Sequence, residues 1–282
     1  RSAQKNPRLI EAEQKAPEKT RPWDEYLAIF LQPSRIKNGL KFWAQHQQTL
    51  ERATALYGAP PEIVVAIIGV ETLYGGYTGP HRVLDSLTTQ GFDHPTRQNF
   101  FFQELVEYVL ACREHGLDPY TQKGSYAGAM GLPQFMPSNY RRLAVDFNDD
   151  GRVDLWSAED AIGSAAHYLQ RYRGPDNRWH RDQPLIVAAM GTADPDWPLN
   201  PRQPSHSYQQ ISDRLTAIPG IPPETPVGII ELAGKEHREQ WLGLPNFYNV
   251  LSYNPRAYYA MAVYRLARAI ADQRARATAE RD

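Results

Sequence analysis

The sequence has little cysteine, no excess of either charge and no long apolar run, and each shortage excludes a class of protein. The single cysteine, Cys112, rules out an internal disulfide and a cysteine-cluster metal site. Lysine and arginine total 31 against 32 aspartates and glutamates, so the basic excess typical of nucleic-acid binding is missing. Mean hydropathy is −0.58, and no apolar run approaches the roughly 18 to 20 residues that cross a bilayer. We therefore expect no nucleic-acid partner and no transmembrane span.

The beginning of the chain shows neither an initiator methionine nor an apolar signal core. We interpret it as a mature or trimmed form from which any targeting segment has been removed. Residues 1–22 are polar and charged, which predicts a loosely held N-terminal arm. The whole length of 282 residues fits one large domain or two to three small ones, and can bury a core without disulfides.

Apolar residues recur at helical spacing from Trp23 onward, which predicts a mainly helical protein. Further helices are expected over 99–114, 137–145, 158–171 and 255–274. The stretch 174–226 differs, because it holds ten of the 23 prolines and helices cannot run through such spacing. There we expect irregular structure with short strands at 184–189 and 227–232. The layout is thus helical, then a small mixed insert, then a returning C-terminal helix.

Glu71 is the only acidic residue between Glu62 and Asp85, and it ends a strongly apolar segment that Pro60 and Pro61 open. An all-round apolar helix should be buried. Burial and the negative end of the helix dipole both raise the pKa of a carboxyl group. Raising a glutamate from about 4.3 to about 6 takes roughly 2 kcal/mol, which these two effects can supply. A protonated carboxyl near neutral pH suits a general acid; the alternative is a surface glutamate, paired for example with Arg82.

The glycine-rich segment KGSYAGAMGLPQFMPSNY covers residues 123–140 and carries Ser125 and Gln134. It is not a phosphate-binding loop, because the terminal Gly-Lys-Ser/Thr is missing. Glycines allow a ligand to approach the backbone closely, and nearby aromatic side chains can stack on sugar rings. The alternative is tight helix packing through small residues.

An acidic loop has the spacing of an EF-hand. Asp146, Asn148, Asp150 and Asp154 stand at positions one, three, five and nine, and glycine holds position six. Arg152, at position seven, would contribute only its backbone carbonyl. Position twelve is Ser157 rather than the usual glutamate, so Asp160 is the candidate that would close a lengthened loop. We expect a structural calcium ion here and no organic cofactor; the alternative is a polar turn that caps the next helix.

Five segments together resemble the B-type lytic murein transglycosylases of Gram-negative bacteria, the membrane-bound lytic transglycosylase B family. They are VETLYGGYTG, PTRQNFF, KGSYAGAMGLPQFMPSNY, VDFNDDGRVDLWSAEDAIGSAAHYL and NFYNVLSYNPRAYYAMAV. They occur in the family's order at compatible spacing, from about Trp23 to about Ala269.

The resemblance implies a mainly α fold, in which a lysozyme-like core domain is flanked by a helical domain and a small β-containing insert. On this chain the helical domain would comprise 23–58, completed by the C-terminal helix 254–275. The catalytic core would be 59–172, with the EF-hand-like loop at 146–160, and the insert 173–253.

The resemblance also implies non-hydrolytic cleavage of peptidoglycan between N-acetylmuramic acid and N-acetylglucosamine, which leaves a 1,6-anhydro end. Glu71 falls on the family's single catalytic acid, and Asp160 becomes the favoured further calcium ligand. The positions that match substrate-binding residues are Ser125, Gln134, Tyr26, Tyr168, Tyr253, Arg97 and, less closely, Asn246 and Tyr248. Peptidoglycan glycan strands are the expected substrate, and other cell-wall enzymes are further candidate partners.

The location that the resemblance implies is the periplasm, with outer-membrane association through a lipid anchor that this chain does not show.

Three alternative functions stay open. A lysozyme-type hydrolase would need a second carboxylate facing Glu71; the nearest following acid is Asp85, which we interpret instead as a helix N-cap. The others are a non-catalytic peptidoglycan-binding protein and a calcium sensor, which a single unpaired loop disfavours.

Overall fold

The structure is a computed structural model that describes residues 2–14, 21–172, 174 and 178–280. Its helices are α1 (Arg8–Gln14), α2 (Trp23–Phe30), α3 (Pro33–Gln45), α4 (Gln47–Tyr57), α5 (Pro61–Thr72), α6 (Val83–Asp93), α7 (Gln98–His115), α8 (Pro137–Leu143), α9 (Ala158–Arg171), α10 (Tyr208–Ile211), α11 (Pro245–Tyr253) and α12 (Ala257–Ala279). Its strands are β1 (His81–Arg82), β2 (Lys123–Gly124), β3 (Ile186–Gly191), β4 (His206–Ser207), β5 (Leu215–Ile218), β6 (Pro226–Ala233) and β7 (Arg238–Gly243). The predicted mainly α fold with a small β-containing part is confirmed.

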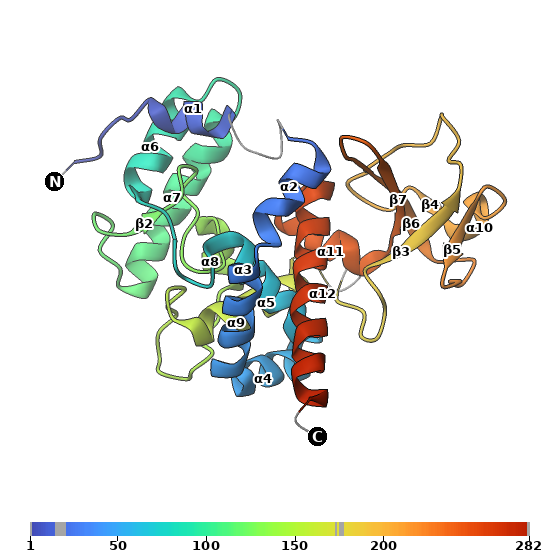
Figure 1. The fold of residues 1–282 in the computed structure, drawn as a ribbon. Helices are drawn as coiled ribbons and strands as arrows, with labels where there is room; N and C mark the ends of the chain where they lie inside the picture. The colour runs from blue at the N-terminus through green and yellow to red at the C-terminus, as the bar shows by residue number, and fades with distance from the viewer. Residues whose placement is uncertain (1, 15–20, 173, 175–177, 281–282) are drawn as a thin grey trace.

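Helices α5 and α12 form the centre of the molecule (Figure 1). Proline at the first position of α5 suits a helix start, because that backbone N–H has no partner in the helix. Eight of its twelve residues are buried, as its all-round apolar sequence predicts. It packs against α12, α3 and α9 in the largest hydrophobic cluster, which also includes α2, α4, α11 and one face of the sheet.

Two smaller clusters complete the core. One joins α6, α7 and α8 and contains Phe101, Tyr108 and Tyr140. The other lies within the five-stranded antiparallel sheet, whose strand order is β4-β6-β7-β3-β5. Residues of β6 alternate between the two sides, because side chains of a strand point to opposite faces in turn. Ile230 and Leu232 therefore face α12, and Ile229 faces the sheet's own core. The domain boundaries expected from the sequence stay a proposal.

Most predicted elements are confirmed, with helices α7, α8, α9 and α12 and strands β3 and β6 within a few residues of their expected bounds. Helix α11 was not expected, since no helix was predicted between residues 171 and 254. The interpretation of Asp85 as a helix N-cap is wrong. Helix α6 begins two residues earlier, and Asp85 lies in its first turn, paired with Arg82 at 2.6 Å.

The N-terminal segment, expected to be loosely held, lies against α6 over its described part. Leu9 in α1 is 1% exposed, and the backbone N–H groups of Gln4 and Asn6 donate to Asp85 and Thr89. Residues 15–20 of the expected arm lie outside the described residues.

Within the described part of the chain, no single helix is long and apolar enough to cross a membrane. Helices α4 and α5 meet the length and composition only when joined, and a bend of 113° separates them.

Gly163 of α9 lies so close to Phe147, in the loop before this helix, that a larger residue at position 163 should disturb the packing. A Cβ at Gly163 would lie 2.2 Å from Cγ of Phe147 in the core, so Gly163→Ala must displace that ring. We expect a loss of about 1 to 3 kcal/mol in the free energy of unfolding, measured by urea denaturation. Gly220→Ala is the control, because nothing lies within 4 Å of its Cβ position. Equal stability of the two variants would contradict the packing described here.

Candidate active site

Glu71 lies in the last turn of α5, where the chain is held in an unusual conformation. Leu73 and Tyr74 both have positive φ angles, 54° and 61°, which is costly for residues with side chains. Their backbone N–H groups close the helix end on the carbonyls of Gly69 and Ile68. These bonds end the helix immediately after Glu71.

Thr72, the neighbour of Glu71, ties the helix end to the glycine-rich segment. Its buried hydroxyl donates to the carbonyl of Leu132 at 3.0 Å and accepts from the N–H of Gly75 at 3.1 Å. The position of Glu71 relative to residues 131–135 therefore depends on Thr72.

The carboxylate of Glu71 is half-buried and accepts a hydrogen bond of 2.5 Å from the hydroxyl of Tyr259 on α12. Tyr259 is 3% exposed. Burial, followed by the nearby carboxylate of Glu71, raises the pKa of Tyr259 well above its usual value, and the pKa of Tyr253 shifts in the same way. Both phenols therefore stay protonated, and Tyr259 acts as the donor.

Aromatic side chains lie next to this pair. Tyr26 is close enough to Tyr259 to affect its pKa. The ring of Tyr253 lies 6.5 Å from that of Tyr259 and 4.5 Å from that of Tyr168. The structure thus places the predicted residues Tyr26 and Tyr253 near Tyr259, and Tyr168 beside Tyr253.

The hydroxyls of Tyr168 and Tyr253 donate to backbone carbonyls, of Ser252 and Pro133 respectively, each at 2.8 Å. Tyr168 is 3% exposed, whereas Tyr253 is half-buried. Their rings thus have fixed positions in the wall of the site.

Gln134 links the two glycine-containing segments of the site. Its side-chain amide donates to the carbonyls of Thr78 at 3.1 Å and Gly131 at 2.9 Å. Its own φ of 51° is costly for a residue with a side chain, and these hydrogen bonds offset part of that cost. The hydroxyl oxygen of Ser125 accepts from the N–H groups of Ala127 and Ala129, so it shapes the glycine-rich loop.

Three other predicted residues have different surroundings. Asn246 is 0% exposed and its amide is bonded to the backbone of His180 and Gln183, so it holds the 178–185 segment in place. Tyr248 is 3% exposed and packs under Gly228. The exposed Arg97 lies over the rings of Phe100 and Phe101, and its contact with substrate remains a prediction.

The acidic loop folds around its own oxygen atoms. Asp146 accepts the N–H groups of Asp150 and Gly151, and the oxygen of Asn148 also accepts from Asp150. The buried Asp160 accepts three backbone N–H groups, from Phe147, Asn148 and Asp154. Burial raises the pKa of Asp160, and these N–H groups act against that rise.

Among the described residues, no group of three or more His, Cys, Asp or Glu side chains is arranged to hold a metal ion. The donor chemistry of the loop nevertheless suits calcium, which takes carboxylate, amide and backbone oxygens alike.

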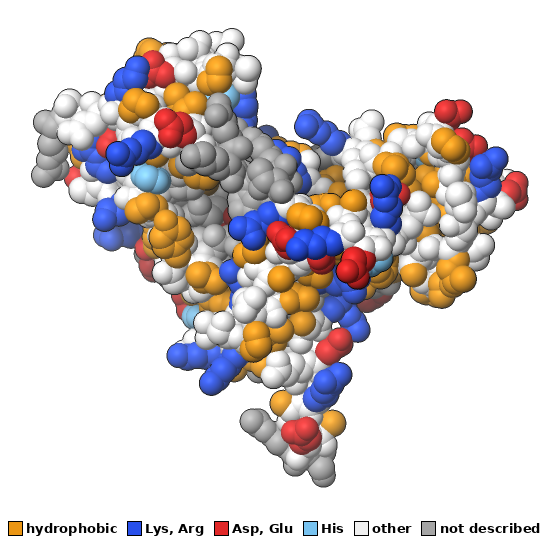
Figure 2. All heavy atoms as spheres, turned by 45° about the horizontal axis from the view of Figure 1, so that its top comes forward, with side chains coloured by type: hydrophobic (Ala, Val, Ile, Leu, Met, Phe, Trp, Pro, Cys, Tyr) orange, Lys and Arg blue, Asp and Glu red, His pale blue; other side chains and the backbone are white. Residues whose placement is uncertain are grey.

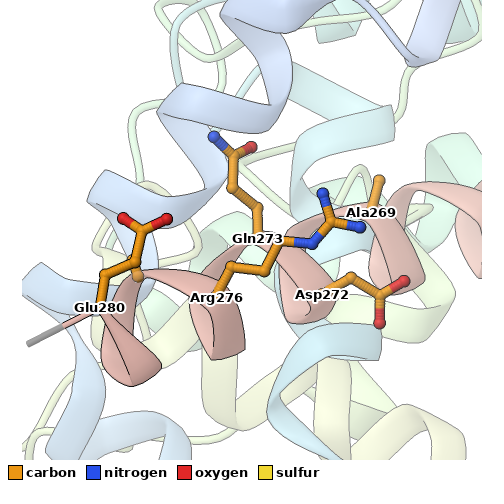
Figure 3. A pocket seen from close by; sticks show the side chains of 6 residues that line it. Ala269, Asp272, Gln273, Arg276 and Glu280 are labelled. Carbon is orange, nitrogen blue, oxygen red and sulfur yellow. The ribbon is translucent and has the colours of Figure 1, made fainter. Parts of the chain in front are cut away.

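One surface hollow of about 480 Å³ lies away from this chemistry. Figure 3 shows side chains that line it, among them Asp272, Gln273 and Arg276 on α12 and Glu280 directly after this helix. Lysine and arginine side chains are interspersed with aspartate and glutamate over the described residues of the face in Figure 2. The hydroxyl of Tyr259 and the ring of Tyr253 lie instead beside Glu71.

Sequence reasoning missed Tyr259, which makes the described hydrogen bond to Glu71. The two residues are 188 positions apart, so no spacing rule connects them. The available signal was the Tyr258-Tyr259 pair at the start of an apolar helix, within a segment already noted for its resemblance.

The Transglycosylase SLT domain family matches residues 1–268, and the chain belongs to this family. Membrane-bound lytic murein transglycosylase B of Escherichia coli K12 is 40% identical over 255 residues, which cover 88% of this chain and 67% of that protein. The chain is a lytic transglycosylase of this type, an enzyme that acts on peptidoglycan.

Solved structures agree with this assignment. Catenated lytic transglycosylase SltB1 of Pseudomonas aeruginosa is 40% identical, with a TM-score of 0.89 over 97% of this chain and 90% of that chain. Lytic transglycosylase Slt35 of E. coli, solved in complex with calcium, is 37% identical, with a TM-score of 0.85 over 97% of this chain and 86% of that chain. The expected lysozyme-like fold and family are thereby confirmed.

Removal of one hydroxyl tests the geometry around Glu71. Tyr259→Phe deletes the donor to the carboxylate, and a hydrogen bond to a charged group contributes about 1.5 to 3 kcal/mol. We expect the rate of glycan release from purified sacculi to fall about tenfold to a hundredfold. Tyr258→Phe is the matched control, since that hydroxyl donates to the carbonyl of Ala233 instead. An unchanged rate in Tyr259→Phe would show that the contact has no part in turnover.

Proposed function

We propose that the enzyme cleaves the β-1,4 bond between N-acetylmuramic acid and N-acetylglucosamine without water and leaves a 1,6-anhydro end. Glu71 acts first as the acid and then as the base. The observation that carries this proposal is the placement of Glu71, held by Tyr259 and enclosed by neutral tyrosines. Asp85, the candidate for a second carboxylate, is bound to Arg82 and to the N–H of Gln4.

Glu71 alone can supply and recover the proton that the reaction needs. Glu71 donates its proton to the glycosidic oxygen while the bond from that oxygen to the muramic anomeric carbon breaks. The substrate's acetamido group stabilises the positive charge that develops, which removes the need for a second enzyme carboxylate. The 6-hydroxyl of the same muramic residue then attacks the anomeric carbon and returns a proton to Glu71. The enzyme thus regains its starting state without a water molecule.

Complexes of relatives support this choice of substrate. SltB3 of P. aeruginosa, 30% identical with a TM-score of 0.78, was solved in complex with NAG-anhNAM-pentapeptide. Slt35 of E. coli was also solved in complex with bulgecin A. We infer that glycan strands bind here across Tyr26, Tyr253 and the loop of Ser125 and Gln134, and that Arg97 meets a substrate carboxylate. Such a substrate implies a periplasmic enzyme.

Glu71→Gln tests the mechanism directly. The amide keeps the size of the side chain but cannot donate a proton to the leaving oxygen, so we expect the rate to fall at least about a thousandfold. Folding and sedimentation with sacculi should remain as in the wild type. Full activity in this variant would refute the assignment of Glu71.

The products distinguish the transglycosylase from a hydrolase. Mass spectrometry of muropeptides released by the wild type should show 1,6-anhydro ends. Free reducing ends would instead indicate attack by water and a lysozyme-type enzyme.

We propose that the acidic loop binds a structural calcium ion away from the chemistry. Side chains of Asp146, Asn148, Asp150 and Asp154 and the carbonyl of Arg152 would hold it. Bound calcium would neutralise acidic side chains that otherwise repel one another in one short loop. The carboxylate of Asp160 already accepts hydrogen bonds from three backbone N–H groups, so its main role is to hold the loop in shape. Any bond from Asp160 to calcium would be made in addition to these.

Calcium removal tests this site. A ligand that binds only the folded state stabilises it by RT ln(1 + [L]/Kd), so chelation should lower the melting temperature by several degrees. Replacement of calcium should restore it, and Asp150→Asn should weaken the response. Asp182→Asn, an acidic residue outside the loop, is the control. A melting temperature that is independent of calcium would mean that the loop is only a turn.

A further inference from the structure

One carboxylate in the β-sheet collects hydrogen bonds from three elements. Glu239 of β7 accepts from the indole N–H of Trp23 on α2 at 3.0 Å and from the guanidinium of Arg265 on α12 at 2.6 Å. It also accepts from the indole of Trp241, two residues along its own strand, at 3.0 Å. The sheet is thereby attached to both helices at a single side chain.

This carboxylate is ionised and strongly held. Burial raises the pKa of Glu239, but the donors from Trp23, Trp241 and Arg265 outweigh burial and lower it overall. Trp23 is 1% exposed, so its indole N–H has no access to water and depends on an acceptor within the protein. The loss of this acceptor would force Trp23 to move.

Of the two helices attached in this way, α12 brings Tyr259 to Glu71, and α2 brings Tyr26 close to Tyr259. Trp23 precedes Tyr26 by three residues on α2, which places both on neighbouring turns, and their rings are 6.4 Å apart. Arg265 lies on α12, six residues after Tyr259, whose hydroxyl donates to Glu71. Figure 1 shows the sheet beside α2 and α12, and contacts of β6 with both helices agree.

We propose that Glu239 is a positioning residue for the reaction, which holds α2 and α12 in register so that Tyr259 meets Glu71 and Tyr26 stays beside Tyr259. This inference rests on the proposed function, because it assigns the β-sheet a part in aligning the same acid. A sheet that lies outside the catalytic helices thus controls the geometry of the site.

The test compares Glu239→Gln with Glu25→Gln. The glutamine has the same size but has lost the charge that binds Arg265 and one of the two acceptor oxygens. Glu25 is the matched control, because its exposed ion pair with Lys235 joins the same helix to the β6–β7 turn. Initial rates of glycan release are measured against substrate concentration, at a temperature where circular dichroism shows every variant fully folded.

We expect Glu239→Gln to lower kcat about tenfold with KM within about twofold, and Glu25→Gln to leave both unchanged. A double-mutant cycle then separates positioning from general stability. On the Tyr259→Phe background, Glu239→Gln should cost less than about threefold, since both changes disturb the same contact. An unchanged kcat in folded Glu239→Gln, or effects that multiply in the double variant, would overturn the proposal.

The rate and the product ends are scored separately. If the wild type releases free reducing ends, the proposed non-hydrolytic reaction fails, while the rate comparison still decides the role of Glu239.

Discussion

The hydrogen bond between Tyr259 and Glu71 is the contact on which the active site depends. It joins the end of α5 to the first turns of α12, across 188 residues of sequence. A carboxyl group that must give and then take a proton has to stay in one place, and a neutral phenol can hold it without supplying a competing charge. The other features of the site hold either the end of α5, which carries Glu71, or α12, which carries Tyr259.

Two kinds of support are visible. Close to the acid, Thr72 fastens the end of α5 to the glycine-rich segment, and Gln134 joins that segment to the loop after α5. Consecutive positive φ angles at Leu73 and Tyr74 end the helix at Thr72, one residue after Glu71. Farther away, the hydrophobic cluster joins α5 and α12, and the sheet is attached to α2 and α12 at Glu239. The site is therefore a product of the whole fold rather than of one motif.

The sequence predicted the helices well where their apolar pattern was strong, as in α5, α7, α9 and α12. It failed at α11, because we assigned residues 173–253 to a small mixed, β-containing insert and predicted no helix there. It also misplaced Asp85, since an acid before Ser-Leu-Thr has the pattern of an N-cap although the helix starts earlier. Asn246 and Tyr248 match substrate-binding positions by sequence. In the structure Asn246 bonds to the backbone of His180 and Gln183, and Tyr248 packs under Gly228, contacts that sequence position alone does not show.

Local pattern by itself determined the buried helix that ends in a single acid, the glycine-rich segment and the spaced oxygens of the acidic loop. These features depend on residues close together in the chain, so periodicity and spacing can identify them. Only the tertiary structure decided that Tyr259 donates to Glu71, that Arg82 binds Asp85 and that Glu239 joins three elements. Apart from the bond between Arg82 and Asp85, these contacts link residues far apart in sequence, and they form only when the core packs the elements together.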